Sequence, residues 1–173
     1  MHTETSIEKP SSTMIFNFNP DVDASNWFIL NDGVMGGESA ASVRVNEEGN
    51  GVFEGNVSTA NNGGFASVRY RPESLEMTGK NTVSFRIKGD GKPYQFRVKK
   101  KVSDKESFIT TFQTSGEWET ISIPLNELYP SYRGRKLDQP NYDATELSEI
   151  CFLIANERNE TFKLLIDHIS IES

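Results

Sequence analysis

Asn31-Asp32-Gly33-Val34-Met35-Gly36-Gly37-Glu38-Ser39 is the stretch from which the fold can be inferred, and it follows the apolar run Trp27–Leu30. Glycine loses more backbone entropy on ordering than any other residue, so this density is unfavourable inside a helix or a strand. The stretch therefore predicts an ordered loop in which glycine permits unusual φ angles or close backbone approach. Two later segments, Asn61–Phe65 and Lys88–Lys92, have a similar composition and predict loops of the same kind.

Short apolar segments separated by turn residues surround these loops, and no segment has a sustained helical period. This pattern is typical of an all-β sandwich or jelly roll. The alternation of Tyr94, Phe96 and Val98 indicates a strand with one inward face. The expected strands are Met14–Phe18, Ala41–Asn46, Gly51–Ser58, Phe65–Arg71, Thr82–Lys88, Pro93–Val102, Ser107–Thr114, Trp118–Pro124, Ile150–Ala155 and Phe162–Ile171.

Turn chemistry predicts how some of these strands are joined. Asn50-Gly51 indicates one hairpin, and Gly89-Asp90-Gly91 predicts a tight hairpin between Thr82–Lys88 and Pro93–Val102. The segment 126–141 is expected to be a long polar loop, and residues 143–147 one helical turn. Ile150–Ala155 is apolar on both faces, which predicts a central, doubly covered strand.

The length of 173 residues suits one domain, and we expect a flexible N-terminal arm over residues 1–12 and a single jelly-roll domain over residues 13–173. A net charge of −7 disfavours binding to nucleic acid. No apolar run is long enough for a membrane span. The first residues lack the apolar region of a signal peptide, and Cys151 is the only cysteine, so a reducing cytoplasm is the expected location.

Four motifs in order make a distinctive set: Trp27 with the 31–39 loop, Phe53-x-Gly55, the segment 62–69, and Lys88-Gly89-Asp90-Gly91-x-x-Tyr94. Together they resemble the complex I intermediate-associated protein 30 family, over roughly residues 14–172. The resemblance implies a galactose-binding-domain-like jelly-roll β-sandwich. The eukaryotic members of that family look like non-catalytic assembly factors for respiratory complex I or for chloroplast components. The resemblance therefore also implies a non-catalytic assembly factor.

Catalytic and metal sites find little support in the residues. His2 and His168 are the only histidines, no Gly-x-Ser-x-Gly motif is present, and Cys151 lies in an apolar run where a buried structural thiol is expected. Carboxylates in the glycine-rich loops, such as Asp32 and Asp90, are typical turn formers. The segment 21–26 begins like a calcium loop but has Asn26 where that loop needs glycine. We expect no catalytic residues, no metal and no cofactor.

Binding is better supported than catalysis. Gln95 and Arg97 alternate with the inward residues of their strand, and Arg69 can share their face, which offers bidentate donors for carboxylates or sugar hydroxyls. An ordinary solvated face is the alternative. Basic clusters at 97–101 and 133–136 indicate either solvated surface or a site for an acidic partner. Trp27 and Trp118 are either core aromatics or sugar platforms.

These observations favour a non-catalytic binding or assembly module, chaperone-like in character, with protein partners that include respiratory-complex subunits. A carbohydrate-binding module is the first alternative, and a weak hydrolase or small-ligand sensor is the second. The predicted ligand- or partner-binding residues are Asn31, Asp32, Met35, Asn62, Arg69, Gln95, Arg97, Gln113 and Trp118.

Overall fold

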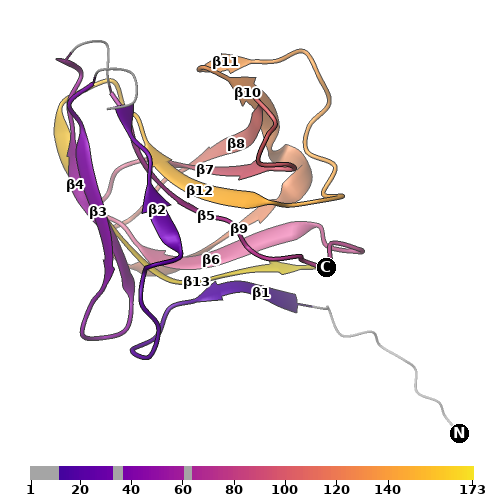
Figure 1. The fold of residues 1–173 in the computed structure, drawn as a ribbon, viewed down its shortest axis with the longest axis horizontal. Coiled ribbons are helices and arrows are strands. Elements are labelled where there is room, and N and C mark those ends of the chain that lie inside the picture. Colours follow the sequence, from indigo (N-terminus) through magenta and orange to yellow (C-terminus); the bar gives the residue numbers. More distant parts are fainter. Residues whose placement is uncertain (1–11, 33–36, 61–63) are drawn as a thin grey trace, which may run out of the picture.

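Two antiparallel sheets pack against each other in the computed structural model, which describes residues 12–32, 37–60 and 64–173 (Figure 1). Sheet A has the order β3-β4-β13-β6-β9, with β1 also paired to β13; sheet B has the order β11-β10-β8-β7-β12-β5-β2. The predicted all-β sandwich is confirmed. The strands of sheet A are β1 (Ser12–Asn17), β3 (Ala40–Val45), β4 (Gly51–Val57), β6 (Thr82–Lys88), β9 (Trp118–Pro124) and β13 (Glu160–Glu172). The strands of sheet B are β2 (Trp27–Ile29), β5 (Ala66–Tyr70), β7 (Tyr94–Lys99), β8 (Ser107–Phe112), β10 (Tyr129–Tyr132), β11 (Arg135–Lys136) and β12 (Glu149–Ile154).

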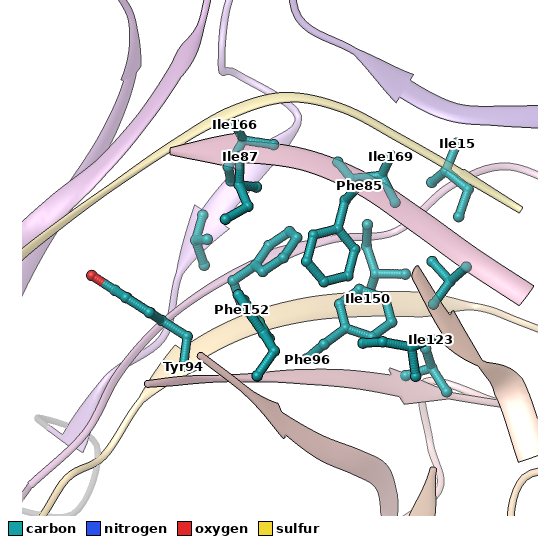
Figure 2. Close-up of a cluster of buried hydrophobic side chains, with 14 of the residues drawn as sticks. Ile15, Phe85, Ile87, Tyr94, Phe96, Ile123, Ile150, Phe152, Ile166 and Ile169 are labelled. Atoms are coloured by element: carbon teal, nitrogen blue, oxygen red, sulfur yellow. The ribbon is translucent and has the colours of Figure 1, made fainter. Parts of the chain in front are cut away.

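Aromatic side chains from both sheets fill the space between them. Phe85 of β6 lies 5.1 Å from the ring of Phe96 on β7 and 5.1 Å from that of Phe152 on β12, measured between centroids (Figure 2). Every residue of β12 is buried, and the strand pairs with β7 on one side and β5 on the other. The expected central strand is therefore confirmed, and its alternate residues divide between the core and the outer face of sheet B.

The predicted hairpin at Gly89-Asp90-Gly91 is wrong. β6 pairs with β9 and β13, whereas β7 pairs with β8 and β12, so this turn carries the chain from sheet A to sheet B. Gly89 is needed because a Cβ there would collide with the side chain of Thr114. Asp90 joins the sheets by accepting hydrogen bonds from Tyr94 Oη and the Lys163 backbone N–H, both at 2.9 Å. Alternation reveals which face of a strand is buried but not which strand lies beside it.

The prediction of a long polar loop over residues 126–141 is also wrong. This segment contains β10 and β11, preceded by a 3-10 turn, η3 (Leu125–Glu127). Leu128 is fully buried, and Pro130 is buried opposite Phe108 of β8. Pro130 is unfavourable to a strand at the level of sequence, because proline has no N–H to donate to a neighbouring strand. Residues 143–147 form no helix: the Thr145 N–H and hydroxyl both donate to Asp143 Oδ1 in a side-chain-closed turn.

The first strands meet in an aromatic cluster. Trp27 is buried and stacks on Tyr70 with ring centroids 5.1 Å apart, while Phe16 and Phe18 contact its other sides. Of the two interpretations left open for Trp27, the structure therefore supports the core aromatic. β1 begins at Ser12, so only residues 1–11 of the expected arm lie outside the described part of the chain.

Gly55 offers a sharp test of the β3–β4 hairpin. Its Cα faces the backbone of β3, where an added Cβ would collide with the Ala40 carbonyl oxygen and lie 2.7 Å from Ala41 Cα. Backbone atoms cannot rotate away from an added Cβ as the end of a side chain can. We therefore expect Gly55→Ala to lower the free energy of unfolding by about 2 kcal/mol in denaturant titrations. The matched control is Asn56→Ala at the next, exposed position, where a change within about 0.5 kcal/mol is expected. Equal stability of Gly55→Ala and wild type would contradict this packing.

Candidate functional site

The outer face of sheet B collects three of the predicted binding residues. Register places Arg97 of β7 opposite Cys151 of β12, and Cys151 opposite Arg69 of β5. Gln95 lies two residues before Arg97 and therefore shares its face. The neighbouring residues Phe96 and Phe152 belong to the core, so this row points away from it. The sequence correctly grouped Arg69, Gln95 and Arg97, and we call this set, with Glu149 and Cys151, the arginine face.

A buried carboxylate neutralises one side of the arginine face. Glu149 is 3% exposed, and its two oxygens lie 3.1 Å from Arg69 Nη1 and 3.0 Å from Arg71 Nε. Arg69 Nε also donates to Ser67 Oγ, and that hydroxyl donates to the Leu30 carbonyl oxygen. This chain of contacts connects the arginine face to the start of the 31–39 loop.

Arg97 has a different environment from Arg69. Its Nε and Nη2 donate to Gln95 Oε1 at 2.9 and 2.7 Å, and no carboxylate of the described residues lies within ion-pair distance of it. Burial, helped by the neighbouring positive charge of Arg69, lowers the pKa of the Arg97 guanidinium, which still remains charged at neutral pH. The arginine face thus holds a shielded cation whose remaining N–H groups are available to a ligand.

The thiol in this row is not arranged for catalysis. Cys151 is 2% exposed, and burial raises the pKa of its thiol, which keeps it protonated and a poor nucleophile. His168 lies on sheet A, where Nδ1 is 3.3 Å from Asp167 Oδ2. The predicted burial of Cys151 is confirmed, and the structure does not bring this histidine to the thiol.

Asp32 organises the glycine-rich loops from inside. Its side chain is fully buried and accepts hydrogen bonds from the N–H of Ser39 at 2.9 Å, the N–H of Phe65 at 3.2 Å, the N–H of Gly64 and the Ser39 hydroxyl. Burial alone would raise the pKa of the Asp32 carboxyl, but these hydrogen bonds outweigh it and hold the pKa below its usual range. A Cβ on Gly37 would collide with this carboxyl, which explains that glycine.

The other predicted binding residues are scattered. Asn31 is half-buried beside Asp32, while Met35 and Asn62 lie outside the described residues. Gln113 is exposed just beyond β8. Trp118 lies on β9 of sheet A, where Arg86 Cζ is 4.5 Å from the centroid of its ring, so it does not join the arginine face. The binding roles of these residues stay predictions.

Sequence reasoning missed the aromatic residues at the other end of sheet B. Lys136 Nζ lies 5.4 Å from the ring centroid of Tyr129, and Arg133 Cζ lies 5.3 Å from that of Tyr132. Both distances fall within the range of cation–π contacts. The available signal was Tyr129-Pro130-Ser131-Tyr132 beside a basic cluster, which alternates like a strand once Pro130 is tolerated.

The two basic clusters of the sequence differ in the structure. In the first, Lys100 pairs with Asp143 at 3.0 Å and Lys101 with Glu146 at 2.7 Å, so local carboxylates neutralise these two lysines, while Arg97 has no carboxylate partner among the described residues. In the second, formed by Arg133, Arg135 and Lys136, none has an ion-pair partner among the described residues. The second cluster therefore keeps its positive charge.

Hollows in the surface lie elsewhere. One of about 600 Å³ opens beside Trp27 and is lined by residues 20–25 and 43–46, and another of about 320 Å³ lies near Leu75 and residues 145–148. Neither includes a predicted binding residue. The described residues contain no group of three or more histidine, cysteine or acidic side chains placed to hold a metal ion, and no helix among them could cross a membrane.

Comparison with known proteins adds to this geometry. The chain is 22% identical to the mouse (Mus musculus) protein "Complex I intermediate-associated protein 30, mitochondrial" over 91% of its length, and it spans about half (55%) of that relative. Among solved structures, it resembles the family 11 carbohydrate-binding module of Clostridium thermocellum in complex with a β-1,3-1,4-mixed-linked tetrasaccharide, with a TM-score of 0.71, 19% identity, and coverage of 92% of this chain and 94% of that one.

A family 4 carbohydrate-binding module gives a TM-score of 0.61 at 17% identity, with coverage of 91% of this chain and 97% of that one. These likenesses confirm the galactose-binding-domain-like jelly roll that the resemblance implied. The family model for complex I intermediate-associated protein 30 (CIA30) matches residues 16–166. The chain therefore belongs to the complex I intermediate-associated protein 30 family.

Proposed function

We propose that this protein is a non-catalytic binding module that contacts a protein partner through the arginine face of sheet B. The observation that carries the proposal is the convergence of Arg69, Gln95 and Arg97 on one sheet face, with Arg97 lacking a carboxylate partner among the described residues. A shielded guanidinium without a counterion is costly for a folded chain, and a carboxylate from a ligand would offset that cost. The separation of His168 from Cys151 on different sheets supports a role without catalysis.

The identity of the partner is proposed from the family. The mouse relative is named for association with a complex I intermediate, so we propose that subunits of a respiratory complex are among the partners. Because the chain spans about half of that relative, the proposal concerns the activity of this domain alone. We propose a cytoplasmic location, because the single cysteine, Cys151, is a buried free thiol, which is compatible with a reducing compartment.

Affinity capture from the native cell, followed by mass spectrometry, tests this role. We expect wild type to recover respiratory-complex subunits, and the double variant Gln95→Ala/Arg97→Ala to recover roughly tenfold less, because central interface arginines often dominate binding energy. Arg44→Ala, which removes an exposed arginine from sheet A, is the matched control and should behave like wild type. Equal recovery with the double variant, or turnover of compounds in a broad activity screen, would contradict the proposal.

A carbohydrate-binding module is the second candidate. The observation that favours it is that Tyr129 and Tyr132 lie on the same sheet as Gln95 and Arg97, since aromatic rings and bidentate donors are groups that hold sugars. The solved family 11 module was bound to a mixed-linked tetrasaccharide. Titration with that tetrasaccharide decides the matter: heat of binding at millimolar concentration, lost in Gln95→Ala/Arg97→Ala, would support this candidate, and no heat would eliminate it.

A further inference from the structure

The outer face of sheet B carries cations at two places. Around the arginine face, Arg69 and Arg71 share one carboxylate, Glu149, and Arg97 has no carboxylate partner among the described residues. At the β10–β11 end, Lys136 of β11 shares this outer face and has no ion-pair partner among the described residues. The whole chain carries −7, so this local excess opposes the charge of the rest of the protein.

Register connects the two ends into one surface. Arg97 of β7 lies opposite Ile109 of β8, and Ile109 lies opposite Tyr129 of β10. Tyr129 in turn lies beneath Lys136 of β11. We call the line of Arg97, Tyr129 and Lys136 the basic strip. At a strand spacing of about 4.8 Å, it runs roughly 14 Å across four strands.

We propose that the basic strip binds an acidic segment of the protein partner, with one Asp or Glu carboxylate paired to Arg97 and another against Lys136 of β11. This inference rests on the proposed function and specifies the chemistry of its partner. An extended peptide rises about 3.3 Å per residue, so carboxylates roughly four residues apart reach both ends of the strip. A neutral sugar would leave this charge uncompensated, which is why an acidic peptide suits the surface better.

Arg97 is the anchor of this arrangement because, unlike Arg69, it has no carboxylate partner among the described residues. Gln95 Oε1 accepts from Nε and Nη2 and so fixes the plane of the guanidinium group. The N–H groups of Nη1 and the second N–H of Nη2 then point in fixed directions within that plane. A carboxylate that accepts from a positioned guanidinium forms a charge-assisted hydrogen bond, stronger than a neutral one. Exposed Lys136 of β11 adds long-range attraction that salt screens.

Fluorescence anisotropy with a labelled poly-L-glutamate peptide tests the inference on the intact chain. We expect wild type to bind at low ionic strength, with Arg97→Gln at least tenfold weaker and Arg97→Lys between the two, because lysine keeps the charge but not the planar fork. Lys136→Gln should bind several-fold more weakly and show a smaller dependence on salt. The matched control is Lys163→Gln, which removes one exposed cation from β13 of sheet A and should bind within twofold of wild type.

Three results would overturn the inference: no binding by wild type at low salt, equal weakening by Lys163→Gln and Arg97→Gln, or displacement of the peptide by inorganic phosphate at concentrations where glutamate has no effect. Thermal melting of each variant ensures that a lost fold is not mistaken for a lost contact. If the peptide fails while capture of respiratory-complex subunits still depends on Gln95 and Arg97, the acidic segment is wrong and the protein-binding role stands. If capture fails while the peptide binds as described, the basic strip does bind acidic segments and the proposed respiratory-complex partner is wrong.

Discussion

Asp32→Ala is expected to lower the free energy of unfolding by about 3 kcal/mol, because it removes the shared acceptor of four hydrogen bonds, two of them buried and two partly buried. The donors are the N–H groups of Ser39, Gly64 and Phe65 and the Ser39 hydroxyl. Ser39 extends the effect, since its hydroxyl also accepts from the Ser58 N–H at 2.9 Å. Urea titration followed by tryptophan fluorescence measures the loss, and Asp32→Asn should be destabilised in the same direction, because its amide nitrogen cannot accept from these donors.

The contribution of Asp32 should also depend on pH with a definite sign. Its folded-state pKa lies below the model-peptide value of 3.8, so the stabilisation is fully present above that value and is lost as pH falls through the folded-state pKa. The difference in stability between wild type and Asp32→Ala should therefore be constant near neutrality and shrink below about pH 4. Asp23→Ala is the matched control: it removes two exposed hydrogen bonds that the Ser25 N–H and hydroxyl donate to Asp23 Oδ1, and it should lower the free energy of unfolding much less. Equal losses for the two variants would show that Asp32 does not organise the loops.

The fold was largely readable from the sequence because the two signals that decide it are local. Alternation located the strands and their buried faces, and the glycines marked places where backbone or side chains approach too closely for a Cβ, as at Gly55 and Gly89. Strand pairing was not readable, since Tyr94–Lys99 has the same alternation whether its neighbour is β6 or β12. The β10 strand was missed because Pro130 argues locally against a strand, while its burial opposite Phe108 is a tertiary contact.

The arginine face was partly predictable for the same reason. Parity alone placed Gln95 with Arg97, but the approach of Arg69 through Cys151 needed the order of three strands in sheet B. Trp118 was grouped with these residues on residue type, and only the topology shows that it lies on sheet A. Nothing in the sequence distinguishes Arg97 from Arg69, because the difference is the presence of Glu149, which lies 80 residues from Arg69 along the chain.

Glu149→Gln is expected to have opposite effects on stability and on binding. Removing the buried carboxylate leaves Arg69, whose side chain is 12% exposed, without its counterion, and breaking a buried pair in this way costs about 3 kcal/mol. The same change removes the one negative charge on the arginine face, so a labelled poly-L-glutamate peptide should bind several-fold more tightly at low salt. Denaturant titration and anisotropy on the same preparation measure the two effects.

Lower stability combined with tighter peptide binding would identify a specific electrostatic effect, because general misfolding would lower both the stability and the affinity for the peptide. Glu54→Gln is the matched control: its ion pair with Arg44 is largely exposed on sheet A, so a loss below about 1 kcal/mol and unchanged peptide binding are expected. Adding Arg69→Met to Glu149→Gln should recover part of the lost stability, because no buried charge then lacks a partner at that position. Weaker peptide binding by Glu149→Gln, at a temperature where it is fully folded, would mean that the arginine face does not act as a site for acidic segments.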